Sequence, residues 1–182
     1  MTGPPAEGSR VAWADVPEQV RAEIESACGA AVVEAVTAPG GFSPGLAARV
    51  VCADGRRRFV KAASGEVNPD TPRLHRQEAG ILADLDPLIR SGRLPAPRLR
   101  ATAEHGSWFA LILEDINGQH PVLPWQDEQL DQVLGDVMVT GTSSTAGDLG
   151  RATTPGTGFG VILANVQAGT VSAWHRSGRC AR

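Results

Sequence analysis

Arg56-Arg57-Arg58-Phe59-Val60-Lys61-Ala62 is the stretch that decides the fold of this chain. Lys61 is the only lysine among 17 basic residues, and all the others are arginines. Because the chain otherwise uses arginine, we do not expect Lys61 to be an ordinary surface residue. The β-prone residues around it follow Asp54-Gly55, a pair that is typical of a tight hairpin turn. We therefore predict a β-hairpin whose first strand is the apolar run over residues 46–53 and whose second strand ends near Lys61.

A glycine- and proline-rich segment, residues 39–45, precedes this hairpin. Enzymes that hold a nucleoside triphosphate place a flexible loop over the phosphates and a cation beside them. The order of glycine loop, strand, turn and lysine-bearing strand therefore indicates a triphosphate site. A plain β-turn loop is the alternative interpretation of residues 39–45.

A long helix after the hairpin carries an acidic residue on its apolar side. We predict this helix from Asp70 or Thr71 to about Ile89. Its expected apolar face consists of Leu74, Ile81, Leu82, Leu85 and Leu88. Glu78 lies on the same face, where a carboxylate is costly to bury unless a cation neutralises it. We predict an ion pair between Glu78 and Lys61; the alternative is that this pair has only a structural role in an α+β domain.

The remaining elements complete a small domain of the α+β class. We expect a helix that begins at Asp15 and stops at Gly29, with strands over residues 31–36, 98–103 and 108–114. A further helix is predicted over residues 127–139. The predicted architecture is an antiparallel sheet of about five strands with one long helix against it.

Composition and charge exclude several classes of partner. The net charge is −3 without a basic stripe, which argues against nucleic acid, and the longest apolar run, residues 108–113, is too short to cross a membrane. Cys28, Cys52 and Cys180 form neither a disulfide framework nor a zinc pattern. Residues 1–11 are predicted to be disordered and show no secretion signal. We therefore expect a cytoplasmic protein with reduced cysteines.

Four segments, taken in order and with their spacing, resemble the amino-terminal lobe of aminoglycoside phosphotransferases. They are residues 40–45, Phe59-Val60-Lys61, Leu74-His75-Arg76-Gln77-Glu78 and Leu111-Ile112-Leu113-Glu114-Asp115. The resemblance covers about residues 12–138, which we take as the main domain. It implies a protein-kinase-like fold and ATP-dependent phosphorylation of a hydroxyl on an aminoglycoside or another small-molecule acceptor.

The resemblance also implies roles for individual residues on the phosphate side of a nucleotide site. Lys61 would hold the α- and β-phosphates of ATP, and Glu78 would orient Lys61. Gly41, Ser43 and Gly45 would cover the phosphates.

Backbone groups near Glu114 and Ile116 would, by the same resemblance, bond the purine. The glycine loop departs from the kinase pattern Gly-x-Gly-x-x-Gly, because Pro44 has no N–H to donate. We therefore expect ATP to bind weakly, without a tight cradle for its phosphates.

The transfer machinery of the family is not found in this sequence. The family uses a His-Gly-Asp-x-x-x-x-Asn segment and a further Asp that holds magnesium; the nearest segment here is Ala146-Gly147-Asp148-Leu149, with Thr153 in place of Asn. No acidic residue follows Asp148 to serve as a magnesium ligand. Residues 139–182 are rich in Gly, Ser and Thr and are predicted to be a low-order tail that replaces the second lobe.

We therefore expect a truncated aminoglycoside-phosphotransferase-like protein that does not catalyse by itself. One alternative is a non-catalytic fragment that binds nucleotide. The other is an interaction module that self-associates through its exposed cleft, because half of a two-lobed protein leaves apolar surface uncovered.

Overall fold

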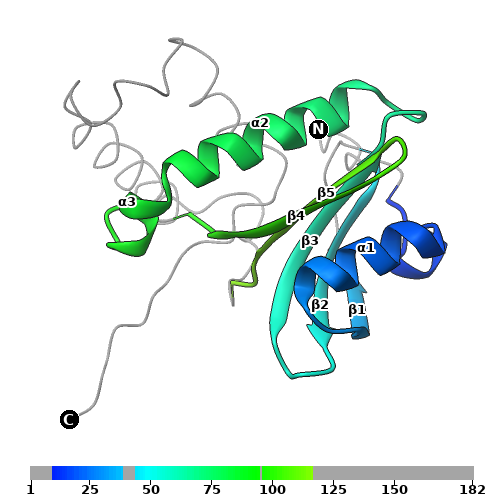
Figure 1. Ribbon diagram of the computed structural model, residues 1–182, viewed down its shortest axis with the longest axis horizontal. Coiled ribbons are helices and arrows are strands. Elements are labelled where there is room, and N and C mark those ends of the chain that lie inside the picture. The colour runs from blue at the N-terminus through cyan, green and yellow to red at the C-terminus, as the bar shows by residue number, and fades with distance from the viewer. Residues whose placement is uncertain (1–9, 39–43, 95, 117–182) are drawn as a thin grey trace, which may run out of the picture.

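The computed structural model describes residues 10–38, 44–94 and 96–116 (Figure 1). Its elements are a short 3-10 helix Trp13–Asp15, α1 Glu18–Cys28, β1 Val32–Thr37, β2 Leu46–Cys52, β3 Arg57–Ser64, α2 Asp70–Asp84, α3 Asp86–Arg90, β4 Leu99–His105 and β5 Trp108–Glu114. The expected helix over residues 127–139 and the expected tail over 139–182 lie outside the described residues. In the part that is described, no helix is long and apolar enough to cross a membrane.

The five strands form one sheet in the order β1-β2-β3-β5-β4, and all neighbours are antiparallel. The α+β class and the sheet of five strands are confirmed. β3, which carries Lys61, lies in the middle of the sheet, where Lys61 is opposite Ala47 in β2 and Leu111 in β5. The lysine therefore projects from the most enclosed strand of the domain.

The two faces of the sheet are covered by different helices (Figure 1). Alternate residues of a strand point to opposite faces. One face packs with α1 around buried apolar residues that include Ile24, Leu46, Val50, Val60 and Ile112. The other packs with α2 and α3 around Leu82, Ile89, Phe109, Leu111 and Leu113. Lys61 lies on this second face, because its neighbours Val60 and Ala62 belong to the first.

The β2–β3 hairpin is confirmed, and its turn has the chemistry that the sequence indicated. Gly55 adopts a φ of 79°, which glycine tolerates without strain, and Asp54 Oδ1 accepts a hydrogen bond from the Arg56 N–H at 3.0 Å. β3 continues past Lys61 to Ser64, so the lysine lies inside the strand instead of at its end.

α1 begins later than predicted but ends where expected. Asp15 belongs to the 3-10 helix, and α1 starts at Glu18. The cause is Pro17, because a proline pushes the preceding residue to an extended conformation and Val16 has a ψ of 134°. Gly29 ends the helix in the left-handed conformation with a φ of 78°, as expected for a glycine stop.

The long helix predicted to reach Ile89 is divided into two. α2 ends at Asp84 and α3 begins at Asp86, with Leu85 between them. Pro87 is the physical reason, since proline lacks the N–H for a helical hydrogen bond and its ring clashes with the carbonyl four residues earlier. The start at Asp70 is correct, and the Asp70 N–H is held by Asn68 Oδ1 at 2.9 Å.

The predicted apolar face of this helix was partly wrong. Leu74 is 41% exposed, whereas Thr71 and His75 are buried against the sheet. Leu82 is buried as expected. The buried stripe therefore runs one position away from Leu74, and it still contains Glu78.

Strand boundaries differ from the prediction by up to two residues. β1 and β4 each start one residue later than expected and end one and two residues later, respectively, while β5 matches. Of the segment predicted to be disordered, residues 1–9 lie outside the described residues, and Arg10 and Val11 are described. Arg10 forms a parallel β-bridge with Gly45, and the Val11 N–H donates to the Gly45 carbonyl at 3.0 Å.

Candidate functional site

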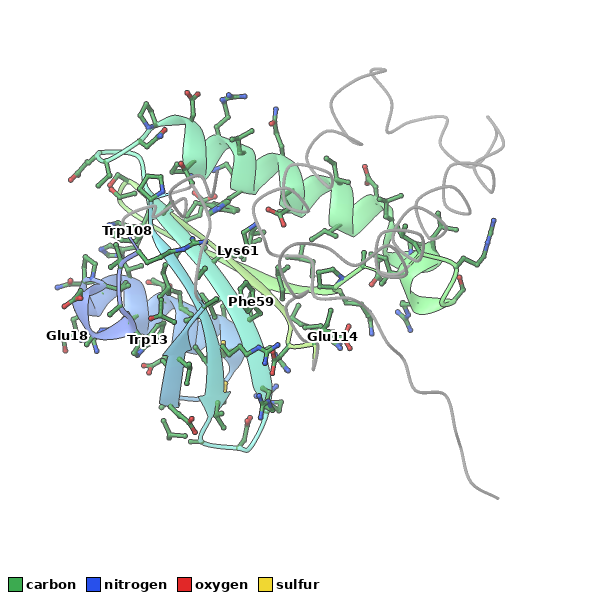
Figure 2. The ribbon with its side chains drawn as sticks, turned by 180° about the vertical axis from the view of Figure 1, so that it is seen from behind. Trp13, Glu18, Phe59, Lys61, Trp108 and Glu114 are labelled. Atoms are coloured by element: carbon green, nitrogen blue, oxygen red, sulfur yellow. The ribbon has the colours of Figure 1, made fainter. Side chains whose placement is uncertain are left out.

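Lys61 and Glu78 form an ion pair between β3 and α2. The distance from Lys61 Nζ to Glu78 Oε2 is 2.6 Å, and the two side chains are 14% and 13% exposed. The predicted pairing of these two residues is confirmed. Figure 2 shows Lys61 pointing from the sheet toward the helix that carries Glu78.

The helical spacing of α2 explains why Glu78 meets the lysine. Glu78 follows the buried His75 by three positions and precedes the buried Leu82 by four, so all three share the face that packs on the sheet. A carboxylate enclosed in this way requires a cation. The strand alternation of β3 supplies one, because it turns Lys61 to the same interface.

His75 is a member of the site that the sequence analysis did not identify. Its ring is buried beside the backbone of Phe109, and burial together with the positive charge of Lys61 lowers the pKa of His75 to about 3. Its Nδ1 has no hydrogen-bond partner within the described residues. The signal in the sequence was the three-residue spacing from His75 to Glu78, which places both on one side of a helix.

Gly45 lies where the glycine-rich segment enters β2, and only glycine fits there. Its φ is 132°, and a Cβ at this position would lie 2.4 Å from the Ala62 carbonyl oxygen. The close approach of Gly45 and Ala62 brings the end of the glycine segment beside the residue that follows Lys61. Gly41 and Ser43, the other predicted loop residues, lie outside the described residues.

A second charged cluster lies at the other end of the same face, around Asp115. The Asp115 side chain is 4% exposed, and its carboxylate oxygens lie 2.8 Å from Arg57 Nε and 3.2 Å from Arg49 Nε. Arg49 comes from β2 and Arg57 from β3, so the Asp115 carboxylate joins these two strands to the segment that follows β5. This cluster was not predicted from the sequence, although Arg57 and Phe59 alternate with Lys61 along β3.

The predicted purine-contacting positions are both engaged within the protein. The Ile116 carbonyl accepts a hydrogen bond from Arg49 Nη2 at 2.7 Å. The Glu114 N–H donates to the Arg98 carbonyl at 2.9 Å, and the Glu114 carboxylate lies 3.4 Å from Arg100 Nη2. The segment after β5 is thus fixed to β2 by Arg49, and β5 itself is fixed to β4.

Phe59 lies between the two charged groups. It is two residues from both Lys61 and Arg57 on β3, so all three side chains project from the same face. Its ring is half-buried and packs with the apolar cluster of that face. Figure 2 shows Lys61, Phe59 and Glu114 following one another along the sheet. The face therefore offers a cation, an aromatic ring and a fixed chain segment in sequence.

The described residues do not provide a metal site. No group of three or more His, Cys, Asp or Glu side chains in that part of the chain is arranged to hold an ion. The magnesium that the resemblance implies has no ligand set there, and the sequence offers no acid after Asp148. A scan against protein-family models and a search of curated proteins found no match to this chain.

Proposed function

We propose that the Lys61 face of the sheet binds the nucleotide of an aminoglycoside-phosphotransferase-like protein, with ATP as the ligand. The observation that carries this proposal is the 2.6 Å contact between Lys61 Nζ and Glu78 Oε2. The pair joins the central strand to the helix of the same lobe, as the resemblance to that kinase-like family implies. The parent activity is phosphorylation of a hydroxyl on a small-molecule acceptor.

The ion pair has a direct chemical use in such a site. A lysine side chain is long and flexible, and holding it in one position costs conformational entropy. Glu78 fixes the ammonium group before a ligand arrives, so that cost falls on folding instead of on binding. An ammonium donates three hydrogen bonds, and contact with one carboxylate oxygen is compatible with contact to phosphate oxygens.

The remainder of the face supports the base and sugar end of a nucleotide. The half-buried ring of Phe59 is next to Lys61 on the same face, and an aromatic ring is a good stacking surface for a purine. The segment at Ile116 is fixed by Arg49, so it offers a defined edge beside that ring. In this arrangement the phosphates point toward Gly45 and the base toward Ile116.

We propose further that the chain binds ATP without transferring its phosphoryl group unaided. Transfer requires a group that accepts the proton of the acceptor hydroxyl and a magnesium ion that neutralises the phosphates. The described residues lack a metal site, and the sequence lacks carboxylates beyond Asp148. The role that we propose for the described residues is therefore to bind and orient the nucleotide.

Isothermal titration of the full chain with ATP tests the binding proposal. Lys61→Met keeps the length of the side chain and removes its charge, and we expect it to weaken ATP binding by about tenfold, which is about 1.4 kcal/mol. Arg90→Ala is the matched control, because Arg90 is an exposed arginine on α3 at the far end of the domain. Equal ATP affinity in the wild type and Lys61→Met would contradict the proposal.

A phosphorylation assay with an aminoglycoside acceptor tests the second part. We expect no phosphoryl transfer above background from the purified wild type. Turnover that survives extensive purification and disappears in Lys61→Met would show that the chain is a complete enzyme, and the non-catalytic interpretation would then be wrong.

A second candidate function, an interaction module, is favoured by one surface feature. β1 is an edge strand, and it exposes Val33 and Val36 by 66% and 56%. Val36 is opposite Arg49 in the sheet register, which places it on the Lys61 face. Light scattering would detect self-association through this face, and Val36→Glu should then shift the protein to the monomer.

A further inference from the structure

The chain before α1 is attached to the phosphate end of the proposed site. Arg10 forms a parallel β-bridge with Gly45, and the Val11 N–H donates to the Gly45 carbonyl at 3.0 Å. Both contacts are made by the backbone, so the position of Arg10 does not depend on its own side chain. Arg10 is therefore held at the place where the glycine-rich segment enters β2.

Gly45 is itself close to Lys61 in the sheet. It lies two residues before Ala47, the partner of Lys61 in β2, and it approaches the Ala62 carbonyl so closely that a Cβ would not fit. The backbone of Arg10 consequently lies one strand away from the lysine-bearing part of β3.

Strand alternation shows on which side the Arg10 side chain lies. Val11 packs against the apolar cluster under α1, so its neighbour Arg10 projects to the opposite, Lys61 face. The buried ring of His75 packs on the Lys61 face, and its pKa is lowered by the charge of Lys61 and, to a smaller extent, by the charge of Arg10. Partial burial of the Arg10 guanidinium lowers its pKa. Arg10 and Lys61 therefore place two positive charges near one buried ring.

We propose that Arg10 is a second cation of the phosphate site and that, with Lys61, it binds the polyphosphate of the nucleotide. This inference rests on the proposed function, because it assigns a further residue to the same site. A guanidinium bonds two phosphate oxygens at once, whereas an ammonium acts as a point charge, so the two residues are complementary. The site would prefer a triphosphate, which carries more negative charge than a monophosphate.

The test compares Arg10→Gln with Arg10→Lys in the full chain. The glutamine removes the charge, and the lysine keeps it while losing the paired geometry. We expect Arg10→Gln to weaken binding of ATP and of inorganic tripolyphosphate by about fivefold, and Arg10→Lys to weaken both by about twofold. Adenosine affinity should be the same in all three proteins. Circular dichroism and the melting temperature verify that both variants fold, and Arg90→Ala again controls for net charge.

The outcomes separate this inference from the proposed function. Weaker ATP binding in Lys61→Met but not in Arg10→Gln would overturn the role of Arg10 and leave the nucleotide site standing. If tripolyphosphate binding depends on Arg10 but ATP binds no more tightly than tripolyphosphate, the role of Arg10 is supported and the proposal that the ligand is a nucleotide is wrong. If the wild type binds neither ATP nor tripolyphosphate, both proposals are wrong.

Discussion

The two faces of the sheet are built differently, although the same five strands contribute to both. The face under α1 is closed by apolar side chains, among them Ile24, Val60 and Ile112, none of which has measurable exposure. The face under α2 also has an apolar cluster, but Lys61, Glu78 and Asp115 are enclosed beside it. A charged group costs free energy to enclose, and the α2 face carries that cost at these three side chains.

This contrast indicates that the two faces serve different purposes. The α1 face stabilises the domain, since burial of apolar surface is the main source of folding free energy. The α2 face holds ionic groups in fixed positions, which is the property that a binding site needs. Substitutions on the α1 face should therefore change stability alone, and substitutions on the α2 face should change stability and binding together.

The largest effect is expected from a pair of matched cavity substitutions. Ile24 under α1 and Leu111 under α2 both have no exposed surface, so Ile24→Ala and Leu111→Ala should each lower the free energy of unfolding by about 3–4 kcal/mol. Urea denaturation measures this. At a temperature where both variants remain folded, only Leu111→Ala should also weaken ATP binding, because Leu111 is opposite Lys61 in the sheet. Equal ATP affinity in the two variants would contradict the division between the faces.

The next effect is a dependence of stability on pH that comes from the α2 face. Folding lowers the pKa of His75 from 6.5 to about 3, because the ring is buried and faces the charge of Lys61. Between these values the unfolded chain binds a proton that the folded chain does not. The stability that this contributes is complete above pH 6.5 and is lost as the pH falls toward 3, by at most about 1.4 kcal/mol per pH unit.

His75→Gln isolates this contribution, since glutamine does not titrate and can still donate to the Phe109 backbone. We expect the difference in unfolding free energy between wild type and His75→Gln to be constant from pH 7 to 9. The wild type should then lose stability faster than the variant from pH 6 to 4. Parallel curves across the whole range would show that folding does not lower the pKa of His75.

The sequence carries a good part of this organisation, because the signals involved are local. The pair Asp54-Gly55 favours a tight turn, and that turn sets the register of β2 against β3. The pairing of Lys61 with Glu78 follows from the strand alternation that turns the lysine to one face and from the helical spacing that places the carboxylate there. The alternation of residues along the strands and the helical spacing also predict the sheet and the helix that covers it, because both patterns are local in the sequence.

What the sequence did not reveal depends on contacts between distant segments. The enclosure of Asp115 by Arg49 and Arg57 requires β2, β3 and the end of β5 to meet, and nothing local in any of these segments indicates it. The burial of His75 was hidden because Leu74, the more apolar neighbour, was taken as the inward residue. The attachment of Arg10 to Gly45 was hidden because a Gly- and Pro-rich terminus resembles a disordered one.

The smallest of these effects on stability concerns Asp115, and it tests whether the second charged cluster belongs to the binding face. Asp115→Asn removes the charge that holds Arg49 and Arg57 together and leaves both guanidinium groups facing a neutral amide. Because both arginines are partly exposed, we expect a loss of about 2 kcal/mol, less than for a fully buried pair. Asp54→Asn is the matched control, since Asp54 contacts Arg56 at an exposed turn and should change stability little.

Hydrogen exchange makes this prediction specific to the segment after β5. In Asp115→Asn the backbone amides of residues 114–116 should exchange faster, while those of β1 and α1 keep the rate of the wild type. The affinity for ATP should also fall in Asp115→Asn, because Arg49 would no longer hold the Ile116 carbonyl in a fixed position. Faster exchange at residues 114–116 with unchanged ATP affinity would restrict Asp115 to a structural role and confine the binding face to the Lys61 end of the sheet.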